Sequence, residues 1–286
     1  MSILVIGKTQ DAWSKIILKN CPAARARKIL LLPNKLGQVL LSLPGRILGY
    51  RVVWLSDNNA LAKIHAHLAK LAKYIITPNQ AAEVRFLKIG VPSAKIKTIY
   101  PTVRVPERIM FPPVENFTLA CDSRVEINNG LGTLLKATAL SKDILGSIKL
   151  IIGGPIKNRA QIEWSCRSLG LGGRVQFAPG ESDVWLEEVH AYILPHAEVG
   201  TLPLSLLQAM GLGRAVIATN KLEHKEFIKN KERGLLIEPN NAEVLSQAII
   251  TLARDKELLA KLGEANQRFM GERQNAMAGL YRQILE

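Results

Sequence analysis

A loop containing glycine and proline, followed by a short apolar helix, is the stretch of this chain best suited to bind an anion. It covers residues 200–219 and reads GTLPLSLLQAMGLGRAVIAT. We expect Pro203 in the first helical turn, then a Gly-x-Gly break and a buried strand at Ala215–Ala218. The N–H groups of Thr201 and Leu202 then precede a helix N-terminus, where unpaired amides and the helix dipole favour negative charge. This arrangement predicts a site for an anion such as a diphosphate.

A second glycine pair follows another predicted strand. Gly153 and Gly154 come directly after the apolar run Lys149–Ile152. Residues without a side chain let the backbone approach a ligand closely. An ordinary tight turn needs the same residue type, so the sequence leaves both alternatives open.

Short apolar strands alternate with helices in two regions of the chain, and this alternation must position any such site. In the first region we expect strands at Ile3–Ile6, Lys28–Leu32, Arg51–Leu55, Tyr74–Thr77 and Lys97–Tyr100, and helices at Asp11–Asn20, Leu61–Lys73 and Ala81–Ile89. In the second we expect strands at Phe117–Asp122, Lys149–Ile152, Val175–Phe177, Ala191–Leu194, Ala215–Ala218 and Gly234–Ile237, and helices at Gly132–Leu140, Asn158–Leu169, Asp183–Val189 and Ala242–Arg254. The pattern predicts an α/β fold of two Rossmann-like, doubly wound domains facing a cleft.

A proline-rich segment divides the two regions. Pro101–Asn116 carries four prolines and indicates a linker. We therefore expect a small basic domain at residues 1–111, a second domain at residues 112–265 and a closing helix at residues 266–286.

The net charge of +14 lies entirely in the first region. Residues 1–110 contain 18 Lys and Arg but only 4 Asp and Glu, whereas the remaining residues contain 20 of each. A basic lobe indicates an anionic surface or polymer as partner, the alternative being a solvated basic face. We expect an anionic membrane and no nucleic acid, because aromatic residues make up only 5% of the chain and no nucleic-acid module is recognisable.

The cysteines and apolar runs bear on where the protein works. Cys21, Cys121 and Cys166 are widely spaced and show no metal-ligand pattern, and no clustered Asp-x-Asp is present. We expect a reduced protein without a metal site. No apolar run is long enough to cross a bilayer, and Met1–Gly7 does not have the form of a signal peptide. A cytoplasmic protein, peripheral on the inner face of the membrane, is the expectation.

Motifs from Tyr74 onward follow one another in an order known from a large enzyme family. They are YIITPNQAAEVRFLKIGVPSAKIKTIYPTV, CDSRVEINNGLGTLLKAT, IIGGPI, RVQFAPG, AYILPH, GTLPLSLLQAMGLGRAVIAT, EHKEFI, RGLLIEPNN and FMGERQNAMAGLYRQIL. In this order they resemble GT-B glycosyltransferases of the retaining family 4 type, most densely from Phe117 to Pro239. The resemblance implies a nucleotide-diphosphate sugar bound in the second domain. It also implies a lipid-linked or glycan acceptor near a first domain that is short for the family, and a closing helix that packs back on that domain.

The resemblance assigns roles to residues of the second domain. Arg124 takes the position that pairs with the donor diphosphate, which a guanidinium binds bidentately, the alternative being a solvated loop arginine. Asn129 stands in place of the family's lysine and keeps a hydrogen-bond donor but no charge. The family's two glutamates fall at Gly200 and Gln208, of which Gln208 can still accept from a ribose hydroxyl. Glu198 is the nearby alternative carboxylate.

Further positions complete the expected site. His196 occupies a slot near the donor that the family often fills with serine, and a satisfied histidine at a strand end is the alternative. The loop after Phe177 holds the base in relatives. On the acceptor and membrane side we expect Lys8, Lys35, Arg46 and Asp57.

The altered family positions leave a second function open. A GT-B protein that scaffolds an active glycosyltransferase, without catalysis of its own, is the second hypothesis, motivated by Gly200, Gln208, Asn129 and the short first domain. A GT-B-shaped epimerase is a third alternative, for which no acid/base residues are evident. In the enzyme hypothesis the nucleotide sugar is a substrate and no cofactor is needed.

Overall fold

The chain divides into two compact units. The computed structural model describes residues 3–5, 29–33, 51–55, 74–77, 79–100, 103–112, 116–156, 158–180, 182–196 and 203–285. Unit 1 comprises Met1–Thr102 together with Glu272–Glu286, and unit 2 comprises Val103–Gly271. The functional assignment of segments 1–111, 112–265 and 266–286 stays a prediction.

Unit 1 contains a parallel sheet. Its strands are β1 (Ile3–Val5), β2 (Ile29–Pro33), β3 (Arg51–Leu55), β4 (Tyr74–Thr77) and β5 (Ile96–Thr98), in the spatial order β1-β2-β3-β4-β5. Helix α5 (Gln80–Lys88) begins after Asn79, whose side chain accepts a hydrogen bond from the Ala82 amide at 2.8 Å. The five predicted strands are confirmed within two residues at each end. The helices expected at 11–20 and 61–73 lie outside the described residues.

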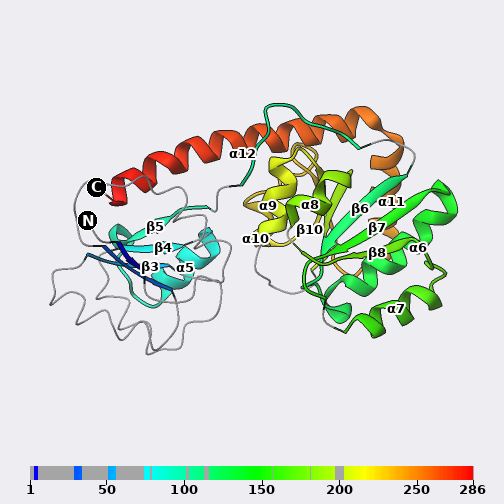
Figure 1. Ribbon diagram of the computed structural model, residues 1–286, viewed down its shortest axis with the longest axis horizontal. Coiled ribbons are helices and arrows are strands. Elements are labelled where there is room, and N and C mark those ends of the chain that lie inside the picture. Colours follow the sequence, from blue (N-terminus) through cyan, green and yellow to red (C-terminus); the bar gives the residue numbers. More distant parts are fainter. Residues whose placement is uncertain are drawn as a thin grey trace. The chain divides into compact units, whose positions relative to one another are not determined.

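Unit 2 is built on a six-stranded parallel sheet (Figure 1). Its strands are β6 (Phe117–Asp122), β7 (Ile148–Gly153), β8 (Val175–Ala178), β9 (Ala191–Leu194), β10 (Ala215–Thr219) and β11 (Leu235–Ile237). Their spatial order is β11-β10-β9-β6-β7-β8. All six were predicted from buried apolar runs, and the structure confirms them.

Helices join these strands. They are α6 (Leu131–Leu145), α7 (Arg159–Ser168), α8 (Ser182–Trp185), α9 (Leu204–Gly211), α10 (Leu222–Lys225), α11 (Ala242–Arg254) and α12 (Lys256–Leu285), with short 3-10 turns η1 (Ser93–Lys95), η2 (Ile127–Asn129) and η3 (Leu186–Glu188). Pro203 is the residue before α9, with an extended ψ of 144°, rather than a residue of its first turn as expected. The closing helix begins at Lys256 instead of residue 266, because Asp255 caps it by accepting from the Leu258 amide at 2.8 Å.

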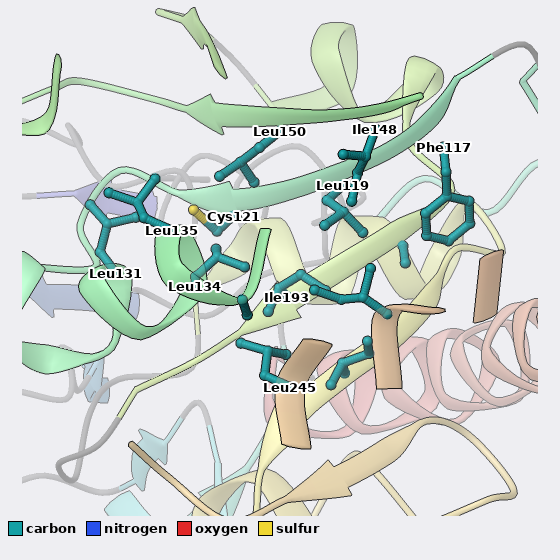
Figure 2. Close-up of a cluster of buried hydrophobic side chains, with 14 of the residues drawn as sticks. Phe117, Leu119, Cys121, Leu131, Leu134, Leu135, Ile148, Leu150, Ile193 and Leu245 are labelled. Carbon is teal, nitrogen blue, oxygen red and sulfur yellow. The ribbon is translucent and has the colours of Figure 1, made fainter. Parts of the chain in front are cut away.

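The hydrophobic core of unit 2 shown here lies on one face of its sheet, between the strands and the helices α6 and α11. Figure 2 shows Phe117, Leu119 and Cys121 of β6 with Leu131, Leu134 and Leu135 of α6, Ile148 and Leu150 of β7, Ile193 of β9 and Leu245 of α11. Because side chains alternate along a strand, the intervening residues Ala120 and Asp122 point to the opposite face. That face packs against α8 and α9, so Asp122 ends β6 on the side where α9 begins.

A buried arginine ties the segment before β6 to the rest of unit 2. The Arg214 guanidinium donates to the carbonyl oxygens of Leu186 at 3.1 Å, Glu187 at 3.1 Å and Met110 at 2.6 Å. Its own carbonyl accepts from the Asn266 side chain at 2.9 Å. Arg214 therefore joins β10, η3, the segment before β6 and α12.

Candidate functional site

The topology of unit 2 itself points to one edge of its sheet. The chain proceeds from β6 outward to β7 and β8, then returns to β9 beside β6 and proceeds outward the other way to β10 and β11. In open α/β sheets, ligands bind outside the carboxyl ends of the strands at such a switch point. In unit 1, by contrast, the described strands follow one another in chain order. The carboxyl ends of β6 and β9 are therefore the candidate site.

Gly130 brings the start of α6 to this edge. It has φ of +108°, and a Cβ atom on it would lie 1.9 Å from the Pro195 carbonyl oxygen that follows β9. Only glycine fits so close an approach. The start of α6, with the positive end of its dipole, consequently lies at the end of β9, and its Leu131 amide donates to the Glu126 carbonyl at 3.1 Å. Asn129 is half-buried immediately before this helix terminus.

Arg124 forms a bidentate ion pair with Asp122. Its Nε donates to Oδ1 at 2.8 Å and its Nη2 donates to Oδ2 at 2.8 Å, while its backbone amide donates to Oδ1 at 2.9 Å. Asp122 is buried, whereas the Arg124 side chain is 59% exposed. A guanidinium carries five N–H groups, and Asp122 accepts from two of them. The edge turned away from Asp122 can therefore bind a second anion.

Asp122 is itself held from the opposite side. The Ser205 hydroxyl, in the first turn of α9, donates to Asp122 Oδ2 at 2.8 Å, and the Tyr192 hydroxyl of β9 lies 2.8 Å from Ser205 Oγ. Burial favours a raised pKa for Asp122, but the hydrogen bonds and charge of Arg124, with the Ser205 bond, outweigh it and lower the pKa. Burial, together with the nearby Asp122 charge, raises the pKa of Tyr192. The carboxylate is ionised and the phenol neutral at pH 7.

His196 contributes a neutral imidazole at the same edge. Burial, then the neighbouring His224, lowers the pKa of His196 to about 4, although the Asp122 charge opposes the shift. The two rings have centroids 6.5 Å apart. Thr219 at the end of β10 donates from its hydroxyl to the His196 carbonyl at 2.7 Å. The ring therefore offers a donor and an acceptor but no positive charge.

The glycine pair at the end of β7 has a packing role. A Cβ atom on Gly153 would lie 2.1 Å from the Trp185 ring, so the missing side chain makes room for the indole of α8. Gly154 has φ of +101° and lies against Ser123, whose hydroxyl donates to the Pro155 carbonyl at 2.8 Å. Gly154 is thus in a turn, whereas the packing of Gly153 against Trp185 is a role that the sequence did not predict. An approach of either glycine to a donor stays a prediction.

Phe177 and Gln208, which were expected near the donor, contact other residues of unit 2. The Phe177 ring packs against the core of unit 2, and the Arg159 guanidinium lies 4.8 Å from its centroid. The Gln208 side-chain carbonyl accepts a hydrogen bond from the Ser182 hydroxyl.

Apart from Phe177 and Gln208, the predicted residues fall into two groups. Arg124, Asn129, Gly153, Gly154 and His196 lie together at the carboxyl edge of the unit 2 sheet. Eight others lie outside the described residues: Lys8, Lys35, Arg46, Asp57, Glu198, Gly200, Thr201 and Leu202. Sequence reasoning missed Asp122, Ser205 and Tyr192. The one signal available was an aspartate at the end of a buried strand, two residues before the predicted arginine.

Metal sites and membrane spans were also sought. Within the described ranges, no three His, Cys, Asp or Glu residues gather in a way that could hold a metal ion. None of the described helices combines the length and apolarity that a bilayer crossing requires. Cys121 and Cys166 are free thiols in buried positions, and burial raises the pKa of both.

Comparison with known families decides the class of the protein. Residues 110–269, more than half of the chain, match the family described as Glycosyl transferases group 1. The chain belongs to this family. The match contains the whole candidate site of unit 2, so Arg124 and its partners are part of a group 1 glycosyl transferase sequence.

Curated relatives are about a quarter identical to this chain over the aligned residues only. The putative glycosyltransferase EpsD of Bacillus subtilis is 25% identical over 152 residues, 52% of this chain and 40% of EpsD. The lipopolysaccharide core biosynthesis glycosyltransferase LpsE of Rhizobium meliloti is 26% identical over 162 residues, 54% of this chain and 46% of LpsE. A third relative is the N,N'-diacetylbacillosaminyl-diphospho-undecaprenol alpha-1,3-N-acetylgalactosaminyltransferase of Campylobacter jejuni, 27% identical over 141 residues, 48% of this chain and 35% of the relative. The chain spans less than half the length of each.

Solved structures share the GT-B fold. Anabaena HepE in complex with UDP has a TM-score of 0.74 at 17% identity, covering 94% of this chain and 79% of HepE. The pneumococcal O-GlcNAc transferase GtfA in complex with UDP and GlcNAc has a TM-score of 0.72 at 14% identity, covering 90% and 56%. The predicted α/β class, with Rossmann-like parallel sheets, is confirmed by this likeness.

Proposed function

We propose that the chain transfers a sugar from a nucleotide-diphosphate donor to a lipid-linked or glycan acceptor at a membrane surface, with retention of anomeric configuration. The observation that carries this proposal is the Arg124 guanidinium at the switch point of unit 2. It is paired to Asp122 on one edge, with the other edge available. The family membership of residues 110–269 supports sugar transfer.

The proposed chemistry is positioning together with stabilisation of the departing diphosphate. Arg124 and the helix amides at the start of α6 and before α9 supply donors aimed at developing negative charge. Asn129 adds a neutral donor, and Glu198 is the proposed carboxylate near the sugar. In this proposal no metal ion takes part. The structural neighbours HepE and GtfA, whose crystals contain UDP, support a nucleotide diphosphate as ligand.

The proposed acceptor side is the basic first region. Its excess of Lys and Arg suits an anionic leaflet, where each cation contributes about 1 kcal/mol of binding free energy. LpsE and the Campylobacter enzyme carry names that refer to lipopolysaccharide and to an undecaprenol-linked sugar, which supports a cell-envelope acceptor. We propose peripheral binding to the inner face of the membrane, with Lys8, Lys35, Arg46 and Asp57 on this side.

Thermal unfolding with nucleotides tests the donor site. UDP, GDP, ADP and dTDP are each added at millimolar concentration to wild-type protein and to Arg124→Ala, with and without anionic liposomes. At least one nucleotide should raise the melting temperature of wild type, and the variant should lose most of that rise. The absence of any shift with all four would remove the donor site from the proposal.

A second candidate is a non-catalytic GT-B subunit that partners an active glycosyltransferase. The specific observation in its favour is the charge of the site: Arg124 is neutralised by Asp122, His196 is neutral, and Asn129 replaces a lysine. One missing charge-assisted bond weakens binding by about ten- to a hundredfold. This candidate predicts no transfer or hydrolysis of any common donor, together with co-purification of a second glycosyltransferase. Turnover by the isolated chain would exclude it.

A further inference from the structure

We propose that Asp122 is a positioning residue that fixes the direction of the Arg124 guanidinium toward the donor diphosphate, with Ser205 holding Asp122 in turn. The inference rests on the proposed function, because it concerns how the same site binds the donor diphosphate. It adds a carboxylate that the family resemblance did not assign.

The geometry of the pair restricts the arginine. Two parallel N–H···O bonds fix the plane of a guanidinium as well as its position. The Arg124 backbone amide, which donates to the same Asp122 oxygen as Nε, ties the start of the side chain to that plane. An arginine that is 59% exposed would otherwise sample many rotamers. Its remaining N–H groups therefore point in one direction before any ligand arrives.

Asp122 and the two residues that support it come from three separate elements. The carboxylate ends β6, Ser205 lies in the first turn of α9, and Tyr192 lies within β9. All three residues are at least 94% buried, with exposed fractions of 6%, 3% and 0%. Since β6 and β9 flank the switch point and α9 follows the loop after β9, this network links both sides of the candidate site.

From its charge alone, Asp122 would be expected to weaken diphosphate binding, which is the opposite of a positioning role. Its carboxylate places a negative charge beside a site for an anion, so its removal should strengthen diphosphate binding if electrostatics dominates. If Asp122 positions Arg124, its removal should weaken binding even though the site becomes more positive. The sign of the change in affinity therefore separates the two explanations.

The experiment measures the affinity increment from a second phosphate. The full chain is titrated calorimetrically with whichever of UDP, GDP, ADP or dTDP gives the largest thermal shift, and with the corresponding monophosphate. We expect Asp122→Asn to weaken diphosphate binding about tenfold and monophosphate binding less than about twofold. Ser205→Ala should lower the diphosphate-to-monophosphate ratio about threefold. A general loss of structure would lower both affinities together and leave the ratio unchanged.

Control variants separate failure of this inference from failure of the proposed function. Glu232→Gln removes a carboxylate from the exposed pair with Lys229 at 2.7 Å, outside the candidate site, and should leave both affinities unchanged. If Arg124→Ala loses the increment while Asp122→Asn keeps or strengthens it, the positioning role is wrong and the donor site stands. If wild type binds none of the nucleotides, both are wrong. Should Asp122→Asn fail to fold, an unchanged ratio in Ser205→Ala would overturn the inference.

Discussion

Gly130 lies against the Pro195 carbonyl oxygen, so closely that a Cβ atom on residue 130 would sit 1.9 Å from it. This contact joins the start of α6 to the end of β9. It depends on two properties of glycine at once, the positive φ of +108° and the absence of a side chain.

Substitution of Gly130 by alanine should therefore destabilise unit 2. We expect a loss of about 2–5 kcal/mol in the free energy of unfolding, from backbone strain and overpacking together. Gly146→Ala is the matched control, because Gly146 also has positive φ (+68°) but a Cβ atom there meets nothing within 4 Å. It should lose only about 1 kcal/mol. Equal losses in urea unfolding of the two variants would contradict the close contact.

Gly153→Ala should displace the Trp185 indole. A Cβ atom on residue 153 would lie 2.1 Å from this ring, and overpacking of this kind costs about 1–3 kcal/mol. The displaced indole should gain exposure, which tryptophan emission reports as a shift to longer wavelength. Gly172→Ala, where a Cβ atom has open space, should leave the emission unchanged. An unshifted spectrum in Gly153→Ala would show that Trp185 does not pack there.

The stability of the protein should fall in mild acid because of His196. Folding lowers the pKa of His196 from 6.5 to about 4. Between these two pH values the unfolded chain therefore binds a proton at His196 and the folded chain does not. Stability linked to this group is full above pH 6.5 and is lost as the pH falls toward 4. Between pH 7 and pH 5 wild type should lose about 2 kcal/mol more than His196→Asn does, measured by urea unfolding. Parallel losses in the two proteins would mean that His196 titrates normally.

Arg214→Lys should weaken unit 2 although it keeps the charge. A lysine ammonium cannot reproduce the fork with which Arg214 meets the carbonyls of Leu186, Glu187 and Met110. The expected loss is about 2–4 kcal/mol in thermal or urea unfolding. Arg174→Lys, at a half-buried arginine whose solvent-exposed hydrogen bond to the Gly146 carbonyl is 2.7 Å long, should lose less than about 0.5 kcal/mol. A comparable loss of stability in both variants would show that the three hydrogen bonds of Arg214 do not contribute as proposed.

The strands of unit 2 were predictable because each is a short apolar run between polar breaks. β6 and β9 begin and end at the predicted residues, since Asp122 ends the first and Pro195 follows the second. Helix ends depended on contacts that a local pattern does not contain. α6 continues past Leu140 because Ser141 on its buried side hydrogen-bonds Ser246 of α11 at 3.0 Å, and Gly146 then ends it with positive φ.

The candidate site was predictable only in part. Arg124 follows from its place in a motif, and His196 from its place after a strand. Asp122 and Ser205 are separated by 83 positions and share no spacing rule. The parallel pairing of β6 with β9 brings them together, and that pairing is a property of the sheet as a whole. The neutral state of His196 likewise depends on burial and on His224, which no local pattern reveals.

The serine hydroxyl of residue 205 carries a single hydrogen, and Asp122 receives it. The phenol of Tyr192 must then give its own hydrogen to Ser205, so the short chain of hydroxyls has a fixed polarity while the carboxylate is ionised. The ultraviolet absorption of Tyr192 should consequently depend on the charge state of the Asp122 carboxylate, two hydrogen bonds away.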